Sequence, residues 1–354
     1  MSIAYAANFQ NVGLYFNLIW EETSLTTANQ KFIVKPEDFE TLTAYRHDSR
    51  HSLVWDCLFV LPEWLRVWWK EFGNDAELTI LSVSQQKAVL GLAPLQIKAD
   101  RASFIGSTNV CDYLDFIVAA GKEGVFFDVL LDHLAQQGLK YLELGLLRPG
   151  STVLASLVKV AENRGCKVSI SSEDISLELE LPATWDDYLS TLTGKQRHEV
   201  KRKLRRLEEA GGINLRIVED AREIPEQMTV FFDLFKKSSD EKAAFMTEQM
   251  MSFFRTLATA LAKLKILKLY ILELNTIPVA VSMCFDFNDM LHLYNSGFDP
   301  RFRALAVGLL CKVLSIKDGI EKGRKKYDFL NGPETYKYRL GGREVPLYHC
   351  RIEL

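Results

Sequence analysis

The side chains best suited to chemistry lie near the end of the sequence, in the segment DFLNGPETYKYR. It gathers carboxylates, phenols and amines where a strand is predicted to end. Asp328 or Glu334 can accept a proton from an amine through water. Tyr336 or Tyr338 can protonate a departing group, and Lys337 can stabilise negative charge on a carbonyl oxygen. These are the roles that acyl transfer to an amine requires. In the alternative interpretation, the charges are merely solvated or paired and the tyrosines pack against a sheet.

A second group of residues lies upstream, where a predicted strand gives way to a helix. Small residues occur there beside Arg301 and Arg303. Small side chains let backbone N–H groups approach a phosphate, and the positive end of the helix attracts its charge. The predicted phosphate-binding residues are Arg303, Ala304, Leu305, Ala306, Val307 and Gly308.

A basic segment, Lys195–Arg206, carries seven Lys or Arg residues in twelve positions. Val200, Leu204 and Leu207 recur at helical spacing, which predicts one packed face on an otherwise basic helix. This pattern favours a site for an anionic substrate such as CoA, a nucleotide-sugar or tRNA. A merely solvated helix is the alternative. Aromatic residues of the kind that stack bases are not interleaved with the basic ones, which argues against a dedicated RNA surface.

The composition excludes several classes of protein. The chain has 354 residues, a net charge of -3 and six widely spaced cysteines without a CxxC pair. These features predict a cytoplasmic protein of about two domains with reduced thiols and no membrane span. The six histidines show no metal-binding spacing, so we expect no metal. Walker, GxGxxG and GxSxG motifs are also missing.

The predicted elements divide the chain into two halves of similar order. The first half is expected to begin with a helix at Pro62 and a hairpin (78–83 and 88–97), followed by further strands, among them 113–118. Helix 124–137, strand 141–144, helix 151–163 and strand 167–170 are expected to follow in that order. The second half starts with strand 175–181 and capped helices at Thr184 and Thr193, followed by helices 223–238 and 248–263, a meander 268–296, helix 304–321, and strands 326–330 and 345–352. The fold is therefore predicted to be α+β, with domains 1–173 and 174–354.

This order of elements resembles the GNAT acyltransferases. More narrowly, the chain resembles the tandem-GNAT group that includes FemAB-type enzymes and CelD-like proteins linked to exopolysaccharide production. The motifs that carry the resemblance are WLRVWWKEFG (64–73), APL (93–95), FIG (104–106), CDYLDF (111–116), KQRHEVKRKLRRLEEAG (195–211), SGFDP (296–300) and YDFLNGPETYKYRLGG (327–342).

The resemblance implies two GNAT-like domains, each a mixed, mostly antiparallel sheet flanked by helices. The second would hold acetyl-CoA or a longer acyl-CoA, and the first would serve the acceptor without binding acyl-CoA. The family's pyrophosphate loop usually reads Q/R-x-x-G-x-G/A, whereas here alanine replaces the first glycine. Alanine disfavours the positive φ that glycine adopts readily, which weakens the inference of CoA binding.

Acceptor contact is also implied by the resemblance, in a cleft between the halves. The implied residues are Asp112, Tyr113, Asp115, Asn295 and Ser296. Two carboxylates suit an amine or sugar hydroxyls. A capped strand end with a buried tyrosine is the alternative for the first three.

The leading hypothesis is an acyl-CoA-dependent transferase that acts on an amine, or on a sugar hydroxyl, by direct attack within a ternary complex. The acceptor would be a small molecule, a glycan or a peptide. A second hypothesis changes the donor to aminoacyl-tRNA, as in FemAB-type enzymes. A third is a non-catalytic adaptor of a polysaccharide-synthesis system, which the alanines of the loop would suit.

Overall fold

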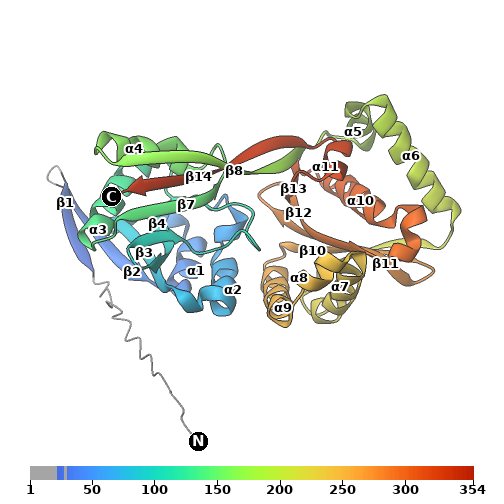
Figure 1. The fold of residues 1–354 in the computed structure, drawn as a ribbon, viewed down its shortest axis with the longest axis horizontal. Coiled ribbons are helices and arrows are strands. Elements are labelled where there is room, and N and C mark those ends of the chain that lie inside the picture. The colour runs from blue at the N-terminus through green and yellow to red at the C-terminus, as the bar shows by residue number, and fades with distance from the viewer. Residues whose placement is uncertain (1–21, 28–29) are drawn as a thin grey trace, which may run out of the picture.

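One continuous mixed sheet runs through both halves of the molecule. The computed structural model describes residues 22–27 and 30–354, and within these the strands form one 14-stranded sheet (Figure 1). The order is β1-β2-β3-β4-β5-β7-β14-β8-β13-β12-β11-β10-β9, and β6 pairs with β4. The strands are β1 Thr23–Thr27, β2 Gln30–Glu37, β3 Glu77–Gln85, β4 Ala88–Lys98, β5 Arg101–Phe104, β6 Ile117–Val118, β7 Tyr141–Leu147, β8 Lys167–Glu180, β9 Ile213–Val218, β10 Leu267–Leu274, β11 Ile277–Phe287, β12 Met290–Phe298, β13 Lys326–Asn331 and β14 Arg343–Glu353.

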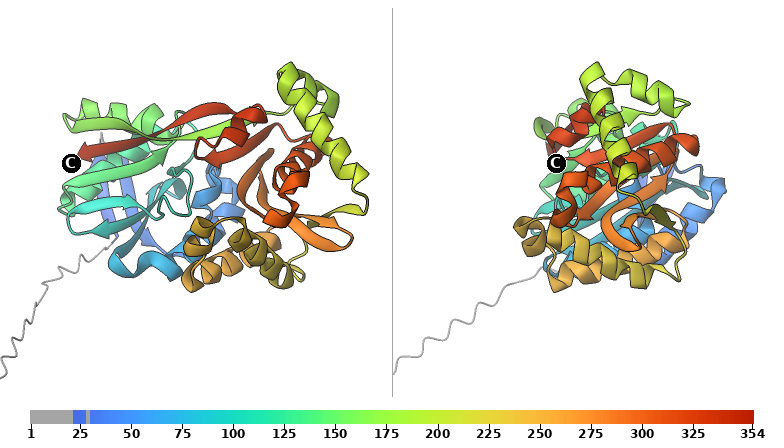
Figure 2. Two further views of the ribbon diagram at one scale, coloured as in Figure 1. Left: turned by 45° about the vertical axis from the view of Figure 1, so that its right-hand side comes forward. Right: turned by 90° about the vertical axis from the view of Figure 1, so that its right-hand side faces the viewer.

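Helices cover the sheet on both sides. They are α1 Phe39–His47, α2 Pro62–Phe72, α3 Glu123–Gln136, α4 Val158–Asn163, α5 Trp185–Thr191, α6 Gly194–Glu209, α7 Ile224–Ser238, α8 Asp240–Phe245, α9 Glu248–Lys263, α10 Val307–Glu321 and α11 Thr335–Arg339. In the second half α7–α9 lie on one side of the sheet and α10 on the other (Figure 2). The fold is α+β, as predicted.

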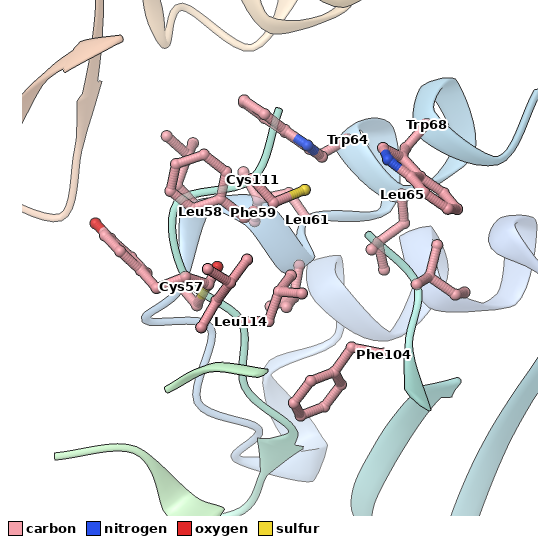
Figure 3. Packing of buried hydrophobic residues seen from close by; sticks show 14 of the residues in the cluster. Cys57, Leu58, Phe59, Leu61, Trp64, Leu65, Trp68, Phe104, Cys111 and Leu114 are labelled. Carbon is pink, nitrogen blue, oxygen red and sulfur yellow. The ribbon is translucent and has the colours of Figure 1, made fainter. Parts of the chain in front are cut away.

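Several elements are confirmed because their local signals are strong. Pro62 begins α2, and Trp64, Leu65 and Trp68 are buried on one side of it. They pack with Phe59 and Cys111, as Figure 3 shows. Thr193 and Gln196 form the predicted capping box at the start of α6.

The two halves share a hydrophobic core. One cluster of buried residues extends from α2 and β3–β4 to α7, α9 and β10–β11. At the boundary, the ring of Phe72 lies 5.3 Å from that of Phe253, and Trp64 packs edge-on against Tyr294 with ring centroids 5.4 Å apart. Aromatic contacts of this kind are worth about 1 kcal/mol each beyond their buried area. The halves are therefore held together by packing as well as by the shared sheet.

The strands β8 and β14 connect the two halves. β14 lies between β7 and β8, so the last strand of the chain pairs with the sheet of the first half. β8 pairs with β14 along its length and also with β13. Since β8 crosses the predicted boundary at 173/174, that division stays a prediction.

Four predicted elements differ from the structure. Strands 167–170 and 175–181 are one strand, β8, because Ser171–Asp174 contains no glycine or proline to break it. The predicted strand 113–118 is mostly a loop, since the Asp115 carboxylate binds backbone N–H groups there instead of leaving them for strand pairing. The predicted helix 304–321 begins only at Val307, after a 3₁₀ turn over Pro300–Leu305. The short helices α8 and α11 were not predicted.

Candidate functional site

An opening in the sheet lies between β12 and β13. The two strands pair in parallel only from Met290 to His292, opposite Lys326–Asp328, and then separate. A register shift in the β11–β12 ladder at Tyr294 and a positive φ of 60° at Leu330 lie just beyond the last pair. A β-bulge of this kind bends a strand and ends its pairing. The opening is therefore built by local backbone geometry on both strands.

The start of α10 lies beside this opening. Its first α-helical bond runs from Leu310 N to Ala306 O, so the N–H groups of residues 307–309 have no acceptor within the helix. Ala306 has a φ of 55° in the left-handed region, in the place where the family loop has glycine. The predicted phosphate-binding residues thus lie at a helix start of the kind that binds anions, with Arg303 and Ala304 exposed and Val307 and Gly308 buried.

The edge of β12 that faces the opening is already occupied. Ser238 Oγ accepts a hydrogen bond from Phe298 N at 2.8 Å, and the ammonium of Lys242 donates to the carbonyl of Ser296. Both groups come from the junction of α7 and α8. Ser296, predicted to bind substrate, therefore has its carbonyl bound within the protein.

Three predicted catalytic residues lie on or beside α11. Lys337 is buried, and its ammonium donates to the carbonyls of Leu330 and Gly332 at 2.9 Å each, to the carbonyl of Asn331, and to Glu334 at 2.8 Å. An ammonium has only three donors, so these contacts use all of them. The contacts of Lys337 favour a role in holding the loop after β13.

The side chains of Tyr336 and Tyr338 lie in different environments. Tyr336 is largely buried, which raises the pKa of its phenol, and its ring lies 4.9 Å from the Lys312 ammonium. Tyr338 donates at 2.6 Å to Glu344 at the molecular surface. Of the two candidate proton donors, Tyr336 is the one enclosed beside the opening.

Asp328, the fourth predicted catalytic residue, is fully buried between the halves. Its carboxylate accepts hydrogen bonds from Leu330 N at 2.7 Å, Tyr113 Oη at 3.1 Å and Ser176 Oγ at 3.3 Å. Arg148 lies 4.0 Å away, over the Tyr113 ring, and also pairs with Glu178. These contacts favour a positioning role for Asp328. Sequence patterns gave no reason to single out Arg148.

The predicted acceptor residues line two separate cavities. Asp112 and Asn295 line a cavity of about 270 Å³ together with Tyr294, Asn331 and Gly332, where the loop before β6 faces the ends of β12 and β13. Tyr113 and Asp115 line a larger one of about 440 Å³ inside the first half. Neither is lined by residues 303–308. The first cavity, which we call the interhalf cavity, is the one beside the opening.

The two carboxylates differ in chemistry. Burial raises the pKa of Asp112 to about 7, although its carboxylate accepts a hydrogen bond from Asn331 N at 2.9 Å. Burial also raises the pKa of Asp115, to about 6, but Asp115 is bound by both Thr152 N (2.8 Å) and Thr152 Oγ1 (2.6 Å). Asp115 thus holds the start of the helical segment that follows Thr152, whereas the alternative interpretation had predicted a capped strand end. Asp112 has the pKa of a general base at neutral pH.

Within the described residues no helix is long and apolar enough to cross a membrane. Over the same residues, no group of three or more His, Cys, Asp or Glu side chains is arranged to hold a metal ion.

The second half combines a helix start after β12 with a split between the parallel strands β12 and β13. Residues 194–338 match the family model of the acetyltransferase (GNAT) domain. Residues 194–338 therefore carry a GNAT domain, in agreement with the resemblance of the sequence.

Solved structures support the fold at low identity. The fold is similar to that of FemX, with a TM-score of 0.61 and 12% identity over 89% of this chain and 96% of that one. It is also similar to the C-terminal domain of a putative lysylphosphatidylglycerol synthetase from Agrobacterium fabrum, with a TM-score of 0.54 and 9% identity over 81% of this chain and 86% of that one. A conserved protein of unknown function from Bacteroides thetaiotaomicron has a TM-score of 0.55 and 10% identity over 95% of this chain and all (100%) of that one. No curated protein sequence matches.

Proposed function

We propose that this protein transfers an acyl group from acyl-CoA to an amine bound in the interhalf cavity. The observation that carries the proposal is the position of the α10 start and the interhalf cavity at the same opening of the sheet. The second half would bind the donor phosphates through the N–H groups of Val307–Leu309, with Arg303 nearby. The first half would contribute Asp112 to the acceptor site. Such a donor supports a cytoplasmic location.

The chemistry needs few groups. The neutral amine attacks the carbonyl carbon, a C–N bond forms, and the C–S bond breaks. Asp112 takes the surplus proton of the amine, for which its pKa of about 7 is suitable. Tyr336, enclosed near the opening, gives a proton to the departing thiolate. Direct attack in a ternary complex requires only that the two substrates be held in contact.

Isothermal titration with acetyl-CoA and longer acyl-CoAs tests this donor. We expect saturable binding that weakens strongly when Arg303 is replaced by glutamate, because the phosphates then meet a like charge. Absence of both heat and thermal stabilisation with every acyl-CoA would exclude the acyl-CoA version. Substrate-dependent turnover that is lost in Tyr336→Phe would exclude a non-catalytic adaptor, including one in polysaccharide synthesis.

A second candidate donor is aminoacyl-tRNA. Two observations favour it: Ser238 and Lys242 already occupy the β12 edge, and the basic helix α6 contacts both α10 and the 3₁₀ turn before it. The helix that carries the basic segment therefore lies beside the start of α10. Reversing the charges of Arg202, Arg205 and Arg206 would abolish tRNA binding and leave CoA binding nearly unchanged. Equal loss of both, or of neither, would count against this donor.

A further inference from the structure

Three lysines are less than 10% exposed in the described part of the chain, and one of them differs from the others. Lys268 (6% exposed) pairs with Glu219 and Asp286, and Lys337 (1%) pairs with Glu334. Lys312 (8%) donates to the carbonyl of Gly308 at 3.0 Å and lies under the Tyr336 ring. Across the described residues no carboxylate lies within ion-pair distance of Lys312. A buried cation without a counter-ion is costly to a protein.

A second amine approaches the same place from the other side of the sheet. Gly297 of β12 lies against α7, because a Cβ added to it would meet the backbone of that helix. The next residue, Phe298, has its ring against Gly308 of α10. Neighbouring strand residues face opposite sides, so α7 and α10 cover opposite faces at the opening. Lys242 follows α7, bonds the Ser296 carbonyl and lies 4.8 Å from the Phe235 ring centroid.

The two amines influence each other. Burial first, and then the charge of Lys242, lowers the pKa of Lys312 to about 8. Burial also lowers the pKa of Lys242, although the Glu334 carboxylate acts in the opposite direction. Each amine is held by a carbonyl and an aromatic ring. The charge of Glu334 acts on both amines, but its carboxylate forms its ion pair with Lys337. An anion placed between them would supply the missing counter-charge.

We propose, on the basis of the donor site of the proposed function, that Lys312 and Lys242 bind a carboxylate carried by the transferred acyl group. The preferred donors are then acidic acyl groups, such as succinyl or glutaryl. Lys312 is four residues beyond Gly308 on α10, which places it in the donor half, and neither lysine lines the interhalf cavity. Because Lys312 is about nine-tenths buried, only the slim acyl end of a donor reaches it, not the bulky nucleotide.

The experiment compares two acyl-CoAs that differ at one end. Succinyl-CoA and butyryl-CoA have the same chain length, but only succinyl-CoA ends in a carboxylate. For the full chain we expect succinyl-CoA to bind about ten-fold to a hundred-fold more tightly, the usual effect of a charge-assisted contact. Lys312→Met and Lys242→Met are expected to reduce this ratio to about one while butyryl-CoA binding is retained. Lys317→Met, an exposed lysine of the same helix, is the matched control.

A donor-free measurement separates this inference from the proposed function. Sodium succinate should raise the melting temperature of the wild type more than sodium chloride at equal ionic strength, because chloride carries no carboxylate, and Lys312→Met should abolish the difference. If no acyl-CoA binds but this effect persists, the acyl-CoA donor fails and the carboxylate site stands. A wild-type ratio near one, or a ratio unchanged in Lys312→Met, overturns the inference. So does the lack of any succinate effect.

Discussion

In each half a helix connects two parallel strands along the chain, yet the two helices begin differently. α3 lies between β5 and β7, and α10 between β12 and β13. α3 begins with Glu123, whose carboxylate accepts a hydrogen bond from Gly121 N. α10 begins with Val307 and Gly308, with no acidic residue in its first turn. The first half therefore places a carboxylate at its helix start, whereas the second half has none in the first turn of α10.

The comparison suggests that the same scaffold serves two purposes. In the proposed function the second half binds the anionic donor, and the first half contributes Asp112 to the interhalf cavity. Duplication of a fold thus need not duplicate a site, because one side chain at a helix start decides what the start can bind.

The largest effect is expected from replacing Asp112, the proposed proton acceptor in the first half, and it should be seen in turnover. Asp112→Asn keeps the shape of the cavity but removes the proton acceptor, so turnover should fall by about 100-fold to 10,000-fold. In the wild type, kcat/KM should rise with pH and reach half its plateau near pH 7, where Asp112 loses its proton. Steady-state kinetics across pH measures both. Asp115→Asn should instead lower stability through its lost cap, and equal kinetic losses in both variants would remove the distinction between them.

Replacing Lys312, the buried amine of the second half, should change the free energy of unfolding by an amount that depends on pH. The pKa of Lys312 falls from 10.5 to about 8, so the unfolded chain binds more protons than the folded one between these values. Stability therefore rises with pH over this window, and below pH 8 the charged amine costs about 3 kcal/mol. Lys312→Met should be more stable than the wild type at pH 7, and the difference should shrink towards pH 10.5.

Denaturant titration at several pH values measures this difference, with Lys317→Met as the control. Subtracting the two curves removes the contributions of the other groups near Lys312, which are Lys242, Glu334, Tyr336 and the thiols of Cys311 and Cys284. A difference that does not vary with pH would show that Lys312 has the same pKa in the folded and the unfolded chain.

Two glycines at equivalent positions test the comparison directly. Gly308 and Gly124 are each the second residue of their helix. A Cβ on Gly308 would lie 2.8 Å from the Phe298 ring, whereas one on Gly124 would meet nothing within 4 Å. Gly308→Val should reduce the free energy of unfolding by about 2 kcal/mol and weaken donor binding. Gly124→Val should leave donor binding unchanged, and loss of donor affinity there would place the donor in the first half.

The smallest effect is expected at Ala306. A left-handed residue other than glycine costs roughly 1 kcal/mol, so Ala306→Gly should stabilise the protein by up to about that amount and retain donor binding. Thermal unfolding measures it. Ala304→Gly, in the preceding turn, should give no gain, and stabilisation there instead would mean that the strain lies elsewhere.

The fold was largely predictable because its signals are local. Aromatic spacing predicts α2, and cap residues predict the starts of α5 and α6. Where a tertiary contact competes with these signals, prediction failed: the Asp115 carboxylate keeps residues 113–116 out of the sheet. The resemblance predicted the two GNAT-like domains, which no periodicity alone would indicate.

The candidate site was less predictable, because its chemistry depends on contacts between distant residues. Lys337 looks like a free amine in the sequence, but three carbonyls bind it. Lys312 is one of four charged residues of α10, and nothing in the sequence distinguishes it from the others. Lys242 bonds the carbonyl of Ser296, which lies 54 residues further along the chain. The predicted phosphate-binding segment lies where its small residues indicated, although its use in binding stays a prediction.

The position of β14 between β7 and β8 has a consequence for biosynthesis. Residues 343–353 leave the ribosome after every other strand of the described sheet, so the facing edges of β7 and β8 stay unpaired until β14 has emerged. Unpaired strand edges attract other chains. A nascent or truncated chain that stops before Arg343 should therefore depend on chaperones and accumulate in aggregates, however well its remaining helices are formed.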